Sequence, residues 1–352
     1  MKRFWFSLML LRHLPLTLSR SFPKIGLFQF LRKASSFFAL PNRELISLRG
    51  FATAALLQGL MTNDVRLIEP KNSLMYSLFL NVKGRVVSDA LIYHGNHQDQ
   101  EEPHFVHISE EPSLRVLVNL NANEVEQSTG DVLFVGKDPR AVPGWCLRML
   151  CHSATASETC ASSEAMYRRT RYCLGLPEGA DEFKSGEGLP LEANADLCHG
   201  VSFSKGCYVG QELTARSRFV GVIRRRVAPI LFESAASSKS VPLNSPIFRI
   251  SKGSSKIVGN RPVGWVRGQE DPSLFLTPIR RYGLALLRLA ECAAAITSGD
   301  KLVADISGTA QVSEAAQVDA AMTCFVQTFA PHFNEPQYRL VPSSAICYLV
   351  KH

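Results

Sequence analysis

The chain has 352 residues, of which 46% are hydrophobic and 20% are charged, and it carries a formal net charge of +8 at pH 7. Such a chain can bury a sizeable core in roughly two or three units and has the composition of an ordinary soluble globular protein. After the first few dozen residues no apolar run is long enough to span a bilayer, and no nucleic-acid reader motif is present. We therefore expect a protein that binds neither membranes nor nucleic acids.

The first 35 residues resemble a mitochondrial transit peptide. They contain serines but no carboxylate, since the first acidic residue of the chain is Glu44. Their basic residues are Lys2, Arg3, Arg12, Arg20, Lys24, Arg32 and Lys33. The apolar segment "FWFSLMLL" fits a secretory signal less well, because arginines continue beyond it and no small-residue cleavage site follows promptly. We expect residues 1–35 to be a transit peptide and the mature protein to reside in the mitochondrial matrix.

The cysteine pattern argues against a disulfide framework or a cysteine-rich zinc site. The nine cysteines are odd in number, and no C-x-x-C pair occurs among them. They are Cys146, Cys151, Cys160, Cys173, Cys198, Cys207, Cys292, Cys324 and Cys347. Scattered free cysteines are mostly small buried hydrophobic residues. The pattern suits a reducing compartment such as the mitochondrial matrix.

Residues 36–216 are predicted to form an α+β region with an antiparallel sheet, because strands are interleaved with helices. The predicted elements are a strand over 43–50, a helix over 51–65, two strands within 73–94 joined by a turn at 81–84, a strand over 104–109 and a helix over 164–175. The stretch 121–165 shows no clear periodicity, and its Ser/Thr/Ala-rich end predicts a loop.

The character of the sequence changes after this region. Residues 217–305 consist of short β-rich runs separated by turns, which predicts a small C-terminal β-barrel. Residues 306–352 carry no strong pattern and are interpreted as a divergent tail.

The stretch "VSFSKGCYVGQELTAR", residues 201–216, concentrates special residue types. Gly206 and Gly210 permit close backbone approach or positive φ, and "GQELTAR" predicts the first turns of a helix. A thiol beside Lys205 and a helix start would tend to ionise, so Cys207 is a candidate nucleophile or metal ligand. The alternative is structural, with Cys207 packed in the core and Glu212 paired with Arg216 on a solvated face.

The segment "KGCYVGQE" resembles the K-G-C-x-x-G-Q-E signature of the YgfZ-type branch of the folate-binding aminomethyltransferase-like superfamily. Other segments match that branch in order: "LLQGLMTNDV", "FLNVKGRVVSDALIY", "RYCLGLPEG", "LPLEANAD" and "GLALLRL". The likeness covers roughly residues 36–290 and implies a T-protein-like, folate-binding ring of α+β subdomains with a C-terminal β-barrel. The sequence departs from the family near residues 121–130, which are apparently shortened, and in its tail.

The resemblance also implies a set of site residues. Glu192, in "LPLEAN", falls where the family has a glutamate that hydrogen-bonds the pterin, because one carboxylate can accept two adjacent N–H donors. Asp89 aligns with the first of two catalytic aspartates, and Ala90 stands in place of the second. We assign catalytic roles to Cys207 and Lys205, with Cys207 also a transient metal ligand. The assigned cofactor-binding residues are Glu192, Asp89, Asn63, Asn81, Gly206, Gly210, Gln211, Glu212 and Arg216.

The function implied by the resemblance is a mitochondrial matrix factor that binds tetrahydrofolate and assists late maturation of [4Fe–4S] proteins such as aconitase and lipoate synthase. Because clusters usually take four protein ligands, Cys207 alone cannot hold one, and a cluster shared with an A-type carrier protein is expected. An assembly factor is favoured over a classical catalyst. The alternatives are a folate-dependent one-carbon transferase, against which the lost second aspartate argues, and a non-enzymatic scaffold without folate.

Overall fold

The structure is a computed structural model. It describes residues 37–40, 43, 45–50, 52–68, 74–93, 107–110, 114–120, 132–140, 145–152, 161–232, 240–252, 254, 256–271, 281–305 and 315–319. The expected transit peptide and the shortened segment near 121–130 lie outside the described residues. Among the described helices, none has both the length and the apolar character needed to cross a membrane.

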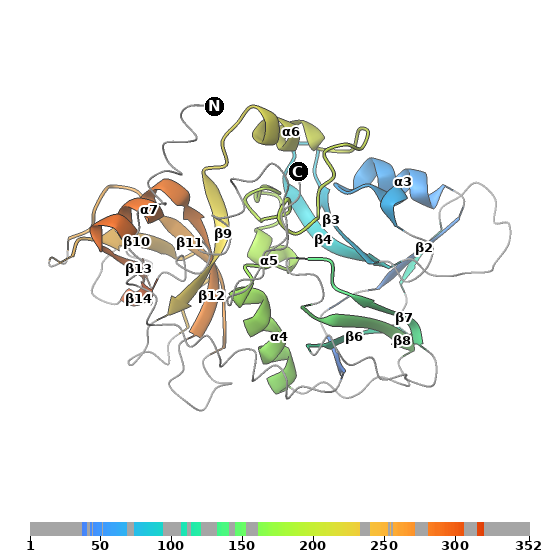
Figure 1. Cartoon of the computed structure of the whole chain (residues 1–352), viewed down its shortest axis with the longest axis horizontal. Coiled ribbons are helices and arrows are strands. Elements are labelled where there is room, and N and C mark those ends of the chain that lie inside the picture. Colours follow the sequence, from blue (N-terminus) through green and yellow to red (C-terminus); the bar gives the residue numbers. More distant parts are fainter. Residues whose placement is uncertain are drawn as a thin grey trace.

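A four-stranded antiparallel sheet lies in the N-terminal half of the chain (Figure 1). Its strands, in spatial order, are β1 (Phe38–Ala39), β6 (Leu114–Asn119), β8 (Leu147–His152) and β7 (Val132–Lys137). Leu117 and Met149 are paired in register and are both buried. Strands β7 and β8 fall almost entirely in the part of the stretch 121–165 for which no element was predicted, so the sequence missed them; the predicted loop at the end of the stretch overlaps only the last two residues of β8.

Two smaller antiparallel pairs complete the N-terminal sheets. One is the hairpin of β3 (Leu74–Leu80) and β4 (Val86–Tyr93), and the other joins β2 (Ile46–Arg49) to β5 (His107–Glu110). Helix α3 (Thr53–Leu60) and the 3-10 turn η3 (Val65–Leu67) stand between β2 and β3 in the chain. The predicted helix, hairpin and strands of this part are confirmed, and the hairpin turn lies where it was predicted, at residues 81–84.

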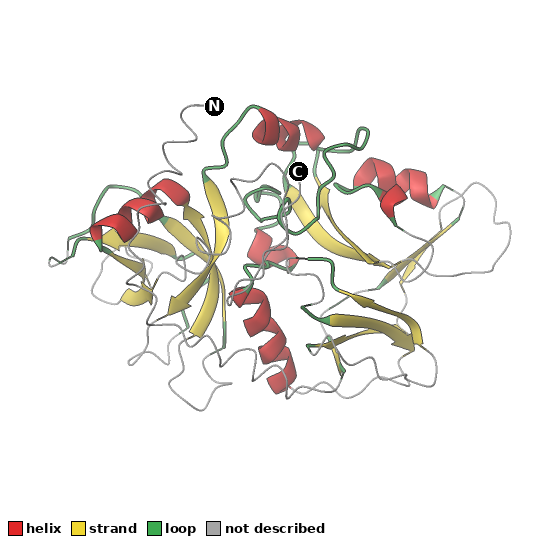
Figure 2. Cartoon of the chain, viewed as in Figure 1, coloured by secondary structure: helices red, strands yellow, loops and turns green. Residues whose placement is uncertain are grey.

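Helices connect these sheets to the C-terminal region. They are α4 (Ala161–Cys173), α5 (Gly179–Phe183) and α6 (Gln211–Phe219). Helix α4 runs between the four-stranded sheet and the strands β9 and β12 (Figure 2). Just beyond its end, Gly175 has a φ of 67°, the left-handed conformation typical of a helix stop. The predicted α4 and the helix start at Gln211 are therefore confirmed.

The C-terminal region contains a closed antiparallel barrel in the order β10-β11-β12-β9-β14-β13. Its strands are β9 (Arg225–Phe232), β10 (Pro246–Ile250), β11 (Gly264–Gln269), β12 (Arg281–Arg288), β13 (Lys301–Asp305) and β14 (Ala315–Asp319), and α7 (Leu289–Ser298) follows β12. Strand β14 pairs with both β13 and β9 and so closes the barrel. The barrel thus extends past residue 305 into the segment interpreted as a divergent tail.

Strand β9 illustrates why the sequence of a barrel strand can be continuously apolar and lack polar alternation. Ala228, Ile230 and Phe232 belong to the main hydrophobic core, whereas the alternate residue Val227 packs with Tyr172 of α4. Because a strand directs successive side chains to opposite faces, a strand buried on both faces has little polar alternation. The packing of α4 on this strand fixes the barrel against the N-terminal half. The mixture of antiparallel sheets and helices confirms the predicted α+β class.

Candidate functional site

Cys207 lies on the loop that leads into α6. Gly210, at the N-terminal cap of α6, has a φ of 78°. A side-chain Cβ there would lie 2.9 Å from Leu80 Cβ and 3.0 Å from Gly84 Cα, and it would overlap the carbonyl oxygen of Asn81. The start of α6 therefore sits directly on the tip of the β3–β4 hairpin. Glycine is required at Gly210 both by its backbone conformation and by this close approach.

Lys205 fastens the same loop to α3. Its Nζ donates hydrogen bonds to the carbonyl oxygens of Gln58, Met61 and Asn63, at 2.7, 2.7 and 2.8 Å. These carbonyls lie at and just beyond the C-terminal end of α3, where the helix dipole favours a cation. Partial burial lowers the pKa of Lys205 to about 8, and the negative charge of Asp64 opposes that shift. The Lys205 ammonium group is thus hydrogen-bonded to backbone carbonyls. The hydrogen bonds of the described residues include none between Lys205 and Cys207, so no direct contact supports the predicted activation of the thiol by Lys205.

The Cys207 thiol is exposed, in contrast to the other cysteines in the described part of the chain, which are all buried. Gln211 Nε2 donates to Cys207 Sγ at 3.6 Å, and Gln211 Oε1 accepts a hydrogen bond from the backbone N–H of Tyr208 at 2.9 Å. Gln211 therefore ties the thiol to the first turn of α6. The structural alternative for Cys207, burial in the core, is wrong.

The other predicted residues of this stretch have open surroundings. Gly206 is exposed, and no heavy atom beyond its chain neighbours would lie within 4 Å of a Cβ placed there. Glu212 and Arg216 are exposed on α6. The ion pairs of the described residues do not include one between them, so the predicted Glu212–Arg216 pair does not form.

Three residues assigned to the cofactor have internal partners. Asn63 Nδ2 donates to the carbonyl oxygens of Tyr76 and His199. Asn81 Oδ1 accepts the backbone N–H groups of Lys83 and Arg85, which shapes the hairpin turn. Glu192 Oε1 accepts a hydrogen bond from Arg225 Nε at 2.8 Å. The hydrogen bonds given for the described residues join no two of these three side chains.

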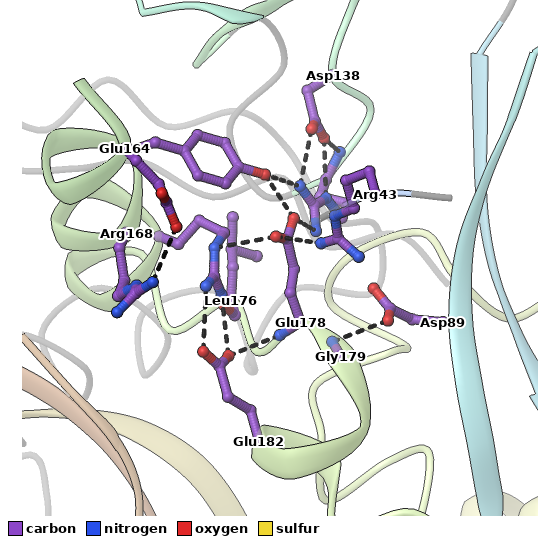
Figure 3. A network of polar contacts seen from close by, with 12 residues as sticks. Arg43, Asp89, Asp138, Glu164, Arg168, Leu176, Glu178, Gly179 and Glu182 are labelled. Carbon is purple, nitrogen blue, oxygen red and sulfur yellow. Dashed lines mark hydrogen bonds and ion pairs between the residues drawn. The ribbon is translucent and has the colours of Figure 1, made fainter. Parts of the chain in front are cut away.

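A buried charge network lies between α4 and the four-stranded sheet (Figure 3). Its centre is Glu178, which pairs with Arg140 at 2.6 Å and Arg171 at 3.1 Å, forms an ion pair with Arg43, and accepts the Tyr167 hydroxyl at 2.6 Å. Its remaining members are Asp138, Arg148 and Glu182. All of these side chains except that of Arg43 are buried.

The arginines of this network keep its carboxylates ionised. Burial alone would raise the pKa of Glu178, but Arg43, Arg171, Arg140 and Arg148 together hold that pKa well below the usual value. Asp138 is also fully buried, and Arg140 and Arg148 lower its pKa in the same way. Burial of a charge is tolerated only where opposite charges and hydrogen bonds compensate it. The network is therefore fully ionised, and its role is structural: it holds α4 to the four-stranded sheet.

A cavity of about 610 Å³ borders this network. Residues from both halves of the chain line it, including Arg43, Tyr167, Glu178 and Gly179 from the N-terminal half and Glu270 from the barrel. Glu192, Asn63 and Asn81 are not among the lining residues. Asp89 lies beside the cavity, because it accepts the backbone N–H of Gly179 at 3.0 Å (Figure 3). Burial raises the pKa of Asp89, and Arg43 opposes that shift.

Sequence reasoning missed both this network and the position of Glu270 at the cavity. From the sequence alone, the basic residues Arg168, Arg169 and Arg171 could either attract the folate glutamate tail or an acidic partner, or form a solvated face. In the structure each one pairs internally, with Glu164, Glu270 and Glu182 respectively. The available signal was charge within apolar strands, such as Arg148 in "WCLRML". A charged residue in a buried strand requires a buried partner.

Comparisons with known proteins place this chain in a family. No known family profile matches it. An iron–sulfur cluster assembly factor, the mitochondrial IBA57 homolog of Neurospora crassa, is 32% identical over 247 residues, which cover 59% of this chain and 56% of that relative. The IBA57 homolog of Pyricularia oryzae is 31% identical over 319 residues, covering 76% of this chain and 77% of the relative.

Among solved structures, the glycine cleavage system aminomethyltransferase T from Bartonella henselae matches with a TM-score of 0.49 and 11% sequence identity. That match covers 83% of this chain and 87% of the other. The sequence relatives decide the assignment, since the match to the Pyricularia protein exceeds 30% identity over most of both chains. The chain belongs to the IBA57 family of mitochondrial iron–sulfur cluster assembly factors.

Proposed function

We propose that this chain is a mitochondrial matrix factor that assists late maturation of [4Fe–4S] proteins and that Cys207 is its key residue. The observation that carries the proposal is the position of the thiol. Cys207 is exposed on a loop held on one side by the three Lys205 hydrogen bonds and on the other by the close contact of Gly210 with the hairpin. A thiol whose only role was to pack in the core would need neither a loop held in place nor exposure to solvent.

The cluster in this proposal is cargo passed between proteins. No group of three or more His, Cys, Asp or Glu side chains suited to a metal ion occurs among the described residues. Since iron–sulfur clusters are usually held by four protein ligands, Cys207 supplies one ligand and a partner supplies the others. The partners we propose are A-type carrier proteins, and the clients are [4Fe–4S] enzymes of the aconitase and lipoate synthase type. Residues 1–35 would direct the chain to the matrix.

The test is complementation of cells that lack the protein. We expect the wild-type chain to restore aconitase activity and protein lipoylation, and the Cys207→Ser variant to restore neither, because a hydroxyl does not replace a thiolate as a ligand to iron. Cys292→Ser is the matched control, since Cys292 is buried in the barrel region. Full rescue by Cys207→Ser would refute the proposed role of the thiol.

We further propose that the chain binds tetrahydrofolate in the cavity, within a T-protein-like ring formed by the N-terminal sheets, α4 and the barrel. The volume of about 610 Å³ lies in the range of small-molecule sites. Glu270 supports the fit, because it lines the cavity, is buried, and its Oε1 accepts no hydrogen bond from any described residue. Arg169 Nε lies 3.5 Å from this oxygen. A carboxylate oxygen in this state suits the adjacent N–H donors of a pterin.

Anaerobic titration of the purified chain with tetrahydrofolate tests this assignment. We expect saturable binding that Glu270→Gln weakens by about tenfold, because a hydrogen bond to a charged group is lost. Glu192→Gln should bind like the wild type, since Glu192 is paired with Arg225 outside the cavity. If only Glu192→Gln abolished binding, the pterin would lie elsewhere, and if no variant and no wild type bound, the chain would be a scaffold. Turnover of a methylamine substrate would instead indicate a one-carbon transferase.

A further inference from the structure

Arg267 is a buried arginine on the barrel side of the cavity. It belongs to β11, lines the cavity and is 9% exposed. Its Nη1 donates a hydrogen bond to Asn244 Oδ1, and Arg267 makes no other hydrogen bond and no ion pair with the described residues. Burial lowers the pKa of Arg267, and the charges of Glu187 and Glu192 do not offset that shift. The guanidinium is therefore a buried charge without a counter-ion among the described residues.

The other arginines that line the cavity already have carboxylate partners. They are Arg43, Arg168 and Arg171, and each forms an ion pair with a glutamate of the same cavity. Moving a charge out of water is costly unless an opposite charge compensates it. Among the lining arginines, Arg267 is thus the one whose charge is left for a ligand to neutralise.

A β-bulge interrupts β11 at Arg267. The register between β11 and β12 shifts between Val266 and Gly268, so that Arg267 is the extra residue of the bulge. Val266 belongs to the main hydrophobic core, whereas residues 267–271 all line the cavity. A Cβ on Gly268 would lie 2.6 Å from the hydroxyl oxygen of Tyr172, so α4 sits directly on the bulge. Bulges often redirect side chains next to functional sites, and this one turns β11 from the core toward the cavity.

The chemistry of Arg267 indicates what kind of group it would bind. A guanidinium presents its N–H donors in a planar fork that matches the paired oxygens of a carboxylate or a phosphate. Because Nη1 is bonded to Asn244, Nε and Nη2 are left to form such a fork. Glu270, three residues later in the chain, offers an acceptor oxygen to the same cavity. The cavity therefore suits a molecule with an N–H-rich head and an anionic end.

We propose that Arg267 binds a carboxylate of the glutamate group of tetrahydrofolate and thereby makes the cavity select folates over pterins that lack this group. This inference rests on the proposed binding of tetrahydrofolate in the cavity. The ligand carboxylate supplies the counter-ion that Arg267 lacks, whereas the other lining arginines are already neutralised. Asn244 holds Nη1 and so fixes the orientation of the guanidinium plane.

The experiment compares the affinities of the full chain for tetrahydrofolate and for tetrahydrobiopterin, which has a pterin ring but no carboxylate, under anaerobic conditions. We expect Arg267→Gln to weaken tetrahydrofolate binding by about tenfold or more, because hydrogen bonds between two charged groups are lost. Its affinity for tetrahydrobiopterin should stay within about twofold of the wild-type value. Arg267→Lys should have an intermediate effect on tetrahydrofolate, since an ammonium group keeps the charge but not the planar fork.

Two further variants make the comparison specific. Arg168→Gln is the matched control, because Arg168 lines the same cavity and is paired with Glu164. It should bind both ligands like the wild type. Glu270→Gln should weaken both ligands, since both present the pterin to the Glu270 carboxylate.

Urea unfolding without ligand shows whether Arg267→Gln is folded. We expect the variant to be at least as stable as the wild type, because it removes a buried charge that lacks a counter-ion. If it did not fold, the wild-type chain would provide the test. Its melting temperature should rise with p-aminobenzoylglutamate, which carries the carboxylates without a pterin, and not with p-aminobenzamide at the same concentration. Equal responses to these two compounds would contradict the proposal.

The outcomes separate this inference from the proposed folate binding. If Arg267→Gln bound tetrahydrofolate like the wild type, the role of Arg267 would be refuted and folate binding would stand. If the variant weakened both ligands equally, Arg267 would contact the pterin, and the assignment to the glutamate group would be wrong. If the wild-type chain bound neither ligand, the folate assignment itself would fail, and this inference would fail with it.

Discussion

Replacing Glu178 with Gln is expected to destabilise the protein by about 3–5 kcal/mol, the usual result of removing one partner from a buried ion pair. Gln retains the shape of the side chain and removes the charge. The guanidinium groups of Arg140 and Arg171, which lie 2.6 and 3.1 Å from the Glu178 carboxylate, would then be buried with too few negative charges around them. The same change would weaken the joint between α4 and the four-stranded sheet.

Urea unfolding, followed by tryptophan fluorescence, measures this effect. Glu164→Gln is the matched control, because Glu164 lies on α4, lines the same cavity and pairs with Arg168 at the partly exposed surface. Its loss should cost no more than about 0.5 kcal/mol. A similar small change for Glu178→Gln would show that the network contributes little to stability.

The Glu178 effect also has a defined pH dependence. Because the folded-state pKa of Glu178 is lowered, its contribution is fully present above the ordinary glutamate pKa and is lost as the pH falls below it. The stability difference between the wild type and Glu178→Gln should therefore be constant near neutral pH. It should shrink as the pH falls through and below the ordinary glutamate pKa.

Local patterns in the sequence predicted much of the secondary structure. The β3–β4 hairpin and α4 were predictable because turn residues and a helix stop such as Gly175 act over a few residues. Strands β7 and β8 were not. Most side chains of β8 are buried by contacts with distant parts of the chain such as β6, its sequence contains the charged residue Arg148, and β7 is defined by its pairing with β8. Strand β14 was missed because residues 306–352 show no strong strand pattern of their own. The strand is defined by its pairing with β13 and β9, which lie earlier in the chain.

The site was predicted in part for a similar reason. The position of Cys207 just before a helix was predicted from the glycines and the family motif, whereas its exposure was not, because the sequence left packing in the core open. The partners of Lys205, Asn63 and Glu192 did not follow, because each lies far away in the sequence. A motif identifies which residues matter, whereas only the fold shows whether a polar side chain faces a ligand or holds two segments together.

Gly210→Ala is expected to destabilise the protein by about 2–5 kcal/mol and to move the Cys207 loop. A left-handed backbone costs an alanine about 1–2 kcal/mol, and inserting a methyl group into a packed contact adds roughly 1–3 kcal/mol. Both penalties apply, because Gly210 has a φ of 78° and a Cβ there would lie 3.0 Å from Gly84 Cα. The strain would be relieved by separating α6 from the hairpin tip.

Gly206→Ala is the control that makes the Gly210 result specific. It adds the same methyl group one residue before Cys207, where nothing lies within 4 Å and the φ is not positive. We expect urea unfolding of this variant to give a free energy of unfolding within about 1 kcal/mol of the wild-type value. Gly210→Ala should also impair cluster transfer at temperatures where the variant is folded, since the loop that carries the thiol would no longer be held against the hairpin tip. Equal effects of the two substitutions would show that the thiol does not depend on the contact between α6 and the hairpin for its position.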